Sequence, residues 1–293
     1  MFPDFLCIGA QKAGTTWLHD NLSQQPEVWL PPVKELHVLD HPSPSLLKRV
    51  FGSRRYHAKA RANVKSAAMG LLNGSGNLET FKTAWRLAYG KRDLDWYSLL
   101  FPSQPGLVCG EICPGYARLS PQVISSLVER NPKLKIIYLL RDPLDRAWSS
   151  VAMHFRKQGR QTIIKEAIGS AEREQLLGRI RNPTFLSHCR YDENISNWLR
   201  YLPADQIYFG FFERIEAEPS EYLADILRFL GIAQKPAAAA PTERVNPGRG
   251  ETRDPIIERE LGIRLLDEAV RVDARFGNAY TAQWLAHARA VAS

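Results

Sequence analysis

Residues 5–23 read FLCIGAQKAGTTWLHDNLS and contain the features that decide the fold. The apolar run Phe5–Gly9 has the length of a buried strand, and Thr15–Ser23 has a helical pattern. Between them Gly9 and Gly14 are separated by four residues, the frame of a nucleotide phosphate loop. A turn of this kind presents the free N–H groups and the positive dipole end of a helix to an anion. The stretch therefore predicts an anion-binding loop.

The lysine of this loop stands in an unusual place. In loops that bind nucleoside triphosphates, a lysine follows the second glycine and a Ser or Thr holds Mg²⁺. Here Thr15 follows Gly14, and the lysine is Lys12, inside the loop. No apolar run ends in an aspartate suited to Mg²⁺, so a phosphate-loop kinase is disfavoured and we expect no metal. The remaining alternative is a strand–helix turn that holds no ligand.

Strand-length apolar runs alternate with helical patterns along the rest of the chain. Further strands are expected at Val108–Ile112, Lys135–Leu140 and Ile207–Phe212. Helices are expected at Pro121–Arg130, Leu144–Arg156, Tyr191–Leu202 and Ser220–Leu230 and again after Asp254, with a loop or linker at Pro236–Thr242. Such alternation predicts an α/β fold, a P-loop-type three-layer sandwich in which helices flank a mostly parallel central sheet. In such folds ligands bind at the carboxyl ends of the strands.

The composition is that of a globular chain. Of the 293 residues, 44% are hydrophobic and 24% are charged, which excludes extensive disorder. No apolar run approaches the ~20 residues that cross a bilayer, and the N-terminus does not resemble a secretory signal. Cys109 and Cys113 resemble half a metal site, and no second pair at ligand spacing completes it. The four cysteines are too few for a disulfide scaffold, so we expect a cytoplasmic protein. We also expect a single domain, 1–293.

The net charge of +8 favours anionic partners: nucleic acid, a phosphorylated cofactor or an acidic polymer. Every charged residue between Lys48 and Lys65 is basic, within a basic helical insertion expected around 43–95. This basic segment is interpreted either as a solvated helix or mobile insertion, or as a wall that receives an anionic acceptor. A nucleic-acid-binding module needs interleaved aromatic residues, and only Phe51 and Tyr56 occur here, so that function has little support.

A second anion-binding element follows the run KIIYLL. Arg141 lies where the predicted strand Lys135–Leu140 ends, and Ser149 follows eight residues later in a predicted helix. An arginine and a serine so placed can share one phosphate through charge-assisted hydrogen bonds. The alternative is an ion pair between Arg141 and Asp142 or Asp145 at the start of the helix.

Together the two elements resemble those of the sulfotransferases that use 3′-phosphoadenosine 5′-phosphosulfate. The resemblance extends to KELHVLD (Lys34–Asp40), DWYSLLFP (Asp95–Pro102), GEICPGY (Gly110–Tyr116) and RYDENISNWLRYLP from Arg190. It covers most of the chain outside the basic insertion. The chain most resembles the branch that contains the glycan and heparan sulfotransferases and many bacterial relatives. The resemblance implies a sulfotransferase of the EC 2.8.2 type.

The resemblance also implies roles for particular residues. Lys12 would contact the transferring sulfuryl group, while Arg141 and Ser149 would bind the 3′-phosphate. The 5′-phosphate would be bound around Ala13, Gly14, Thr15, Thr16 and Trp17, with Tyr191 near the nucleotide. A late loop of the family closes over the 3′-phosphate, and NPGRGETR matches it best, with Gly248 and Arg249 as the candidate ligands.

Glu35 matches the glutamate that acts as general base in the glycan-modifying branch, and His37 is the competing base. In an extended segment the two side chains would point the same way, so both are expected to face the cleft. Ile112 stands where this branch has a lysine, so the contact that this lysine makes with the acceptor is missing here. The neighbouring Glu111 either acts in the cleft or has a structural role.

The expected reaction moves the sulfuryl group to an acceptor hydroxyl by in-line attack, with Glu35 as base and without a metal. The acceptor expected first is a glycan or glycoconjugate, and the basic segment favours an anionic glycan. The alternative is a small-molecule natural product or a lipid. We expect neither a nucleic-acid partner nor an integral membrane segment. The sequence does not determine the oligomeric state.

Overall fold

The computed structural model describes residues 1–40, 54–90, 93–102, 104–157, 169–233 and 253–293. Its centre is a sheet of five strands in the order β2-β3-β1-β4-β5, and every neighbouring pair is parallel. The strands are β1 (Phe5–Gly9), β2 (Val28–Trp29), β3 (Val108–Ile112), β4 (Lys135–Leu140) and β5 (Ile207–Phe211). The α/β fold with a mostly parallel sheet flanked by helices is confirmed.

The strands form where buried apolar runs occur in the sequence. All five residues of β1 are buried, and β1 lies between β3 and β4, with Phe5 opposite both Gly110 and Lys135. The predicted bounds hold for β1, β3 and β4, whereas β5 ends one residue earlier than expected. The two-residue strand β2 was not predicted, because so short a run shows no periodicity.

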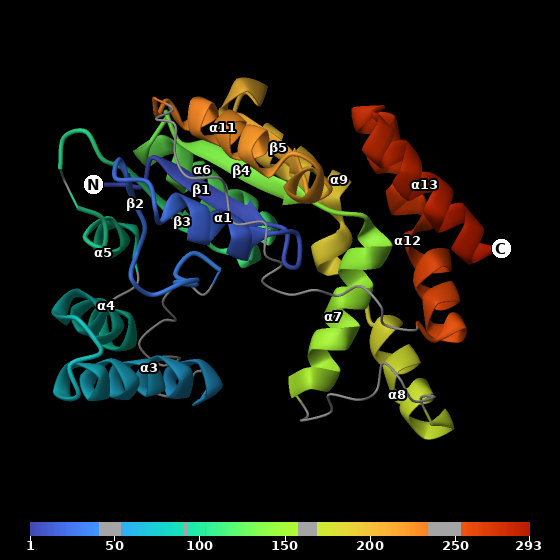
Figure 1. The fold of residues 1–293 in the computed structure, drawn as a ribbon, viewed down its shortest axis with the longest axis horizontal. Coiled ribbons are helices and arrows are strands. Elements are labelled where there is room, and N and C mark those ends of the chain that lie inside the picture. The colour runs from blue at the N-terminus through green and yellow to red at the C-terminus, as the bar shows by residue number, and fades with distance from the viewer. Residues whose placement is uncertain (41–53, 91–92, 103, 158–168, 234–252) are drawn as a thin grey trace.

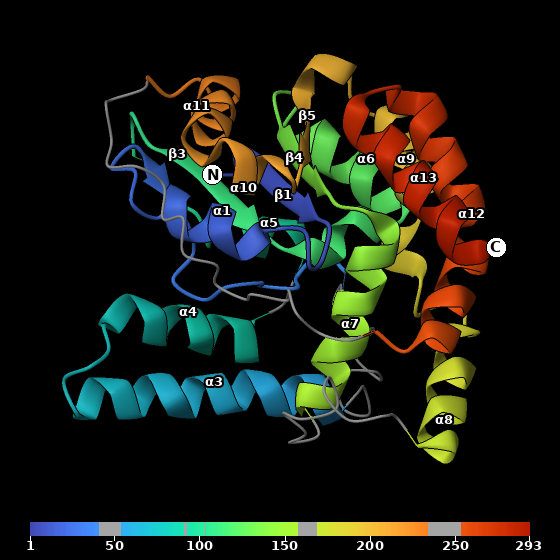
Figure 2. The ribbon, with the colours of Figure 1, turned by 45° about the vertical axis from the view of Figure 1, so that its right-hand side comes forward.

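Helices cover both faces of the sheet. The α-helices are α1 (Thr15–Leu22), α3 (Arg54–Leu72), α4 (Leu78–Tyr89), α5 (Leu94–Ser98), α6 (Pro121–Arg130), α7 (Pro143–Lys157), α8 (Ser170–Ile180), α9 (Tyr191–Leu199), α10 (Arg214–Ala217), α11 (Pro219–Leu230), α12 (Pro255–Phe276) and α13 (Ala279–Ala292). Short 3₁₀ turns are η1 (Pro114–Arg118), η2 (Ser187–Cys189) and η3 (Ala204–Gln206). The sheet lies between α1 and α11 on one side and α6 and α9 on the other (Figures 1 and 2), which makes three layers.

A second apolar cluster lies beside the sheet. It joins Leu144 and Trp148 of α7, Leu176 of α8, Ile257 of α12 and Leu285 of α13. Figure 1 shows these four helices together beyond the ends of β1 and β4. Helix α8 was not predicted, and α9 ends three residues before the expected boundary. Because α7 begins where β4 ends, this cluster fixes the helix that follows Arg141.

The region expected as a basic helical insertion, 43–95, contains α3 and α4 among its described residues, and α5 begins at its end. Figures 1 and 2 show α3 and α4 side by side and away from the sheet. The side chains of 54–61 and residues 41–53 lie outside the described part, so the interpretation of the basic segment stays a prediction, as does the single domain. None of the described helices combines the length and the apolar character needed to cross a membrane.

Candidate active site

The phosphate loop leaves β1 and enters α1 with a left-handed backbone. Gly14 is the N-cap of α1 with φ 90°, and a Cβ there would lie 2.3 Å from Cδ1 of Ile215. Any other residue at this position would therefore be strained, and the end of the Ile215 side chain would have to move. Lys12 is also left-handed, with φ 74°. Because a glycine N-cap supplies no side-chain oxygen, the first-turn N–H groups of α1 are left to bind an anion.

Arg141 joins the second element to this loop. It follows β4, and its Nη1 donates a hydrogen bond of 3.1 Å to the backbone carbonyl of Lys12. Its guanidinium carbon lies 4.4 Å from the ring centroid of Phe212, a cation–π contact that holds the side chain flat. The alternative partner, Asp145, is 3.9 Å from Arg141 and lies closer to Arg253, at 2.5 Å. The guanidinium is thus directed mainly to the phosphate loop.

Of two further predicted residues, Tyr191 contacts Arg141 and Ser149 lies in the helix that follows it. Tyr191 is fully buried, and its hydroxyl donates a hydrogen bond of 3.0 Å to the backbone carbonyl of Arg141. Tyr191 therefore supports the strand end from which Arg141 projects. Ser149 is half-buried on α7, one turn after Asp145, so the two share a helix face. Arg253, which pairs with Asp145, is an additional cation at this end of α7.

The remaining loop residues divide into binding and packing positions. Ala13 is fully buried, and Trp17 stacks on Tyr222 with ring centroids 5.6 Å apart, so its ring packs in the core. Thr16 Oγ1 accepts a hydrogen bond of 3.2 Å from Nζ of Lys34. Lys34 thus brings a second ammonium group to the loop, a contact that sequence spacing did not reveal. Gly248 and Arg249 lie outside the described residues.

The segment Lys34–Asp40 places the two candidate bases together. Glu35 and His37 have φ of 56° and 52°, so the backbone is left-handed at both and not extended as expected. Left-handed residues other than glycine are uncommon and occur often at functional sites. Nε2 of His37 lies 3.5 Å from Oε2 of Glu35, so the two side chains meet although the segment is not extended.

His37 is held in its charged form. Its Nδ1 lies 2.8 Å from Oδ2 of Asp40, and the Cys113 sulfur lies 3.6 Å from the same nitrogen. Hydrogen bonds to Asp40, Cys113 and Glu35 raise the pKa of His37 to about 12. The ring is therefore an imidazolium near neutral pH and has no lone pair with which to accept a proton.

Glu111 fixes this segment to β3. The buried carboxylate accepts hydrogen bonds from Leu36 N at 3.0 Å, Tyr97 Oη at 2.5 Å and Tyr116 Oη at 3.0 Å. The Tyr116 oxygen in turn accepts a hydrogen bond of 3.0 Å from Val38 N. Burial raises the pKa of Glu111 to about 7. Of the two roles left open, these contacts support the structural one.

This carboxyl group leads to a prediction about stability and pH. Its pKa rises from 4.5 to about 7 on folding, so the native state binds the proton more tightly. The stabilisation from that proton is present below pH 4.5 and is lost as the pH rises through about 7. We expect the wild type to lose stability relative to Glu111→Gln across this window, as measured by urea unfolding at a series of pH values. Parallel stability curves for the two proteins would contradict the assignment.

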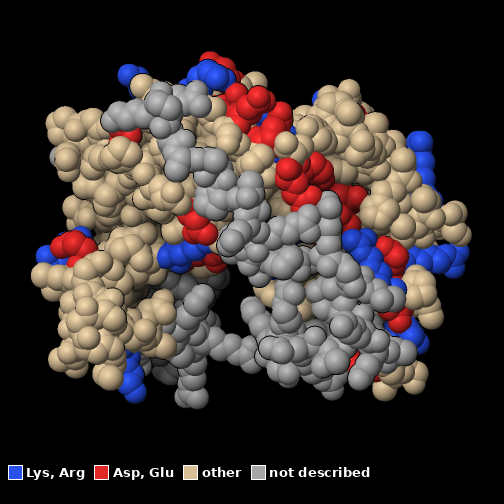
Figure 3. All heavy atoms as spheres, in the orientation of Figure 1, with Lys and Arg blue, Asp and Glu red and all other residues tan. Residues whose placement is uncertain are grey.

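The charges on the surface are mixed. On the face drawn in Figure 3, Asp and Glu gather between α11 and the pair α12–α13, while Lys and Arg are dispersed. The described part of this face therefore has no continuous basic surface of the kind that follows a nucleic-acid backbone.

Comparison with known proteins identifies the family. The model of the sulfotransferase domain family matches residues 2–246, and the chain belongs to this family. The bifunctional heparan sulfate N-deacetylase/N-sulfotransferase 2 of Homo sapiens is 24% identical over 241 residues, which are 78% of this chain and 22% of that protein. Heparan sulfate glucosamine 3-O-sulfotransferase 6 of Mus musculus is 27% identical over 149 residues, 48% of this chain and 40% of that protein. The chain thus spans well under half the length of these curated relatives.

Solved structures support the fold. The sulfotransferase from Alicyclobacillus acidocaldarius superposes with a TM-score of 0.63 at 24% identity, covering 97% of this chain and 99% of that one. The sulfotransferase domain from the curacin biosynthetic pathway superposes with a TM-score of 0.54 at 18% identity, covering 89% and 90%. At these identities the likeness concerns the fold.

Proposed function

We propose that the protein transfers the sulfuryl group of 3′-phosphoadenosine 5′-phosphosulfate to an acceptor hydroxyl. The observation that carries this proposal is the hydrogen bond from Arg141 to the Lys12 carbonyl, which brings two anion-binding elements into one site. A donor with phosphates at both its 5′ and 3′ positions requires two such elements. Membership of the sulfotransferase family agrees with this donor.

The donor contacts follow from the site. The N–H groups at the start of α1, with Thr15 and Thr16, hold the 5′-phosphate end, and Lys12 contacts the transferring group. Arg141 and Ser149 hold the 3′-phosphate, and Arg253 adds positive charge nearby. Gly248 and Arg249 stay the family-based candidates for closing the site. This assignment uses lysine, amides and hydroxyls in the places where a kinase uses Mg²⁺.

The transfer requires a base that takes the acceptor proton and a positively charged group that stabilises the leaving phosphate oxygen. As the acceptor oxygen attacks sulfur, its proton moves to the Glu35 carboxylate and the bond from sulfur to the bridging phosphate oxygen breaks. Lys12 stabilises the charge that develops on that leaving oxygen. His37 already carries a proton, so its role is to hold the Glu35 carboxylate in position. This division of roles favours Glu35 as the base.

The acceptor we propose is a glycan or glycoconjugate. Support comes from two relatives, a bifunctional heparan sulfate N-deacetylase/N-sulfotransferase and a heparan sulfate glucosamine 3-O-sulfotransferase. A small natural product or a lipid is the alternative, because Ile112 is buried in β3 where the glycan-modifying branch has a lysine.

The function is tested by incubating the purified protein with donor carrying labelled sulfate and with separate pools of glycans, lipids and small molecules. We expect label to enter the glycan pool, and mass spectrometry of the product would then locate the sulfated hydroxyl. Transfer only into small molecules or lipids would overturn the glycan assignment. If the protein binds the donor but transfers no label to any pool, then none of these three classes of acceptor is its substrate.

The 3′-phosphate site gives a further prediction. Arg141→Ala should weaken the binding of adenosine 3′,5′-bisphosphate by about 1.5–3 kcal/mol, the size of hydrogen bonds to a charged group. Arg130→Ala is the matched control, because Arg130 ends α6 near the start of β4, and its partner is Asp95. Calorimetric titration of the three proteins measures the effect. Equal binding by the Arg141 and Arg130 variants would remove Arg141 from the nucleotide site.

A further inference from the structure

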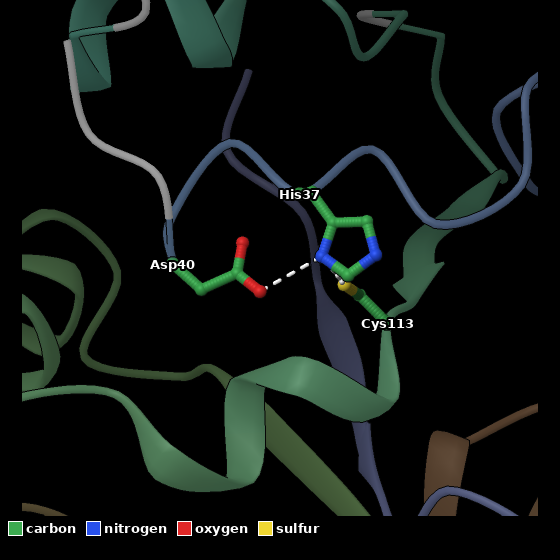
Figure 4. A group of neighbouring side chains, drawn as sticks. All are labelled: His37, Asp40 and Cys113. Carbon is green, nitrogen blue, oxygen red and sulfur yellow. Dashed lines mark hydrogen bonds and ion pairs between the residues drawn. The ribbon is translucent and has the colours of Figure 1, made fainter. Parts of the chain in front are cut away.

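Three side chains from two segments that are distant in the sequence meet beside the proposed base. His37 and Asp40 come from the segment after β2, and Cys113 follows β3 directly (Figure 4). One ligand atom from each of the three lies within 4.8 Å of the other two. The sequence paired Cys113 only with Cys109, as half a metal site, whereas the fold brings His37 and Asp40 to Cys113. We propose that His37, Asp40 and Cys113 form a binding site for Zn²⁺.

The spacing of the ligand atoms suits a tetrahedral zinc ion. Bond lengths of about 2.0–2.3 Å from zinc to nitrogen, oxygen and sulfur imply ligand-to-ligand distances of about 3.3–3.6 Å. The Cys113 sulfur lies 3.6 Å from Nδ1 of His37, which already fits. The Asp40 oxygen lies 2.8 Å from the same nitrogen, as a hydrogen bond. A small outward movement of this carboxylate opens the site for the ion.

The surroundings hold the ligands in place. Nε2 of His37 lies 3.5 Å from Oε2 of Glu35, so a carboxylate orients the imidazole on the side away from the proposed ion. Carboxylate–histidine–zinc arrangements of this kind are general in zinc sites. A Cβ on Gly115 would lie 2.4 Å from Oδ2 of Asp40, so the backbone of η1 packs closely against the cluster. Cys113 itself is buried.

The ligand types select the ion. A thiolate with an imidazole suits zinc among the common divalent cations, whereas Mg²⁺ and Ca²⁺ prefer all-oxygen sites. Binding replaces the thiol proton of Cys113 and the proton on Nδ1 of His37, and both leave to solvent. Three protein ligands leave a fourth position for water. No oxidant or reductant takes part.

Binding is tested on the reduced, metal-free, full-length protein. Titration with Zn²⁺ against a chromophoric chelator should show one equivalent bound, and Co²⁺ should give a thiolate-to-cobalt charge-transfer band. Cys113→Ser should abolish the band, and Asp40→Asn should weaken zinc binding by more than the roughly 10–100-fold lost when only an orienting group is removed. Cys109→Ser is the matched control, because Cys109 is a buried cysteine of β3 whose sulfur faces the Pro102 carbonyl.

Two results would overturn the site. One is the absence of a tight equivalent of zinc, and the other is a cobalt–thiolate band that survives in Cys113→Ser, or zinc affinity that is unchanged in Asp40→Asn. Asp142, Asp145 and His287 form another possible cluster without a thiol, so His287→Asn should leave the band unchanged.

Discussion

The Glu35→Gln variant is expected to turn over about 10²–10⁴ times more slowly than the wild type, the loss typical of a missing acid–base group. Glutamine keeps the shape and hydrogen-bonding capacity of the side chain but cannot accept the acceptor proton. The donor contacts lie in the phosphate loop and around Arg141, so donor affinity should change little. Steady-state kinetics with labelled donor, together with calorimetric titration of adenosine 3′,5′-bisphosphate, measures both quantities.

His37→Asn is the control for this prediction. The pKa of His37, raised by Asp40, Cys113 and Glu35, keeps a proton on the ring throughout the working pH range. Replacing the ring removes a group that positions Glu35, so turnover should fall by less than in Glu35→Gln. An active Glu35→Gln variant together with an inactive His37→Asn variant would make the histidine the base.

Lys12→Ala should lower turnover by about 10²–10³, the loss that follows removal of one preorganised electrostatic group. Charge develops on the leaving phosphate oxygen during transfer, so the ammonium stabilises the transition state more than the bound product nucleotide. The affinity for adenosine 3′,5′-bisphosphate should therefore fall much less than turnover.

Lys34→Ala is the matched variant, because its ammonium contacts Thr16 in the same loop. We expect it to lower turnover and nucleotide affinity by similar factors. If Lys12→Ala behaves in the same way as Lys34→Ala, then Lys12 is a binding residue without a special part in the transfer step.

The sequence predicts those parts of this protein that depend on neighbours along the chain. The buried runs of β1, β3 and β4 have the expected bounds, because a strand covered on both faces is continuously apolar. The phosphate loop was predictable because its glycines, its lysine and the helix start lie within a dozen residues. The meeting of Arg141 with this loop followed from the rule that parallel strands end at one edge of the sheet.

Contacts across the fold were not predictable in this way. Lys34 reaches Thr16, and Cys113 reaches His37, only because separate segments pack together. The left-handed backbone at Glu35 and His37 depends on the hydrogen bonds of the buried Glu111 and Tyr116 to this segment. The charged state of His37, which decides between the two candidate bases, is a product of that packing.

The most direct test of the central claim is the binding of adenosine 3′,5′-bisphosphate to the purified protein in the presence of EDTA. The claim is that the first turn of α1, Lys12 and Arg141 together hold a nucleotide with two separate phosphates and need no metal ion. Calorimetric titration should therefore show one tight site in EDTA and much weaker binding of ATP, with or without Mg²⁺. Binding that requires Mg²⁺, or that favours ATP, would contradict the claim and would instead favour a phosphate-loop kinase.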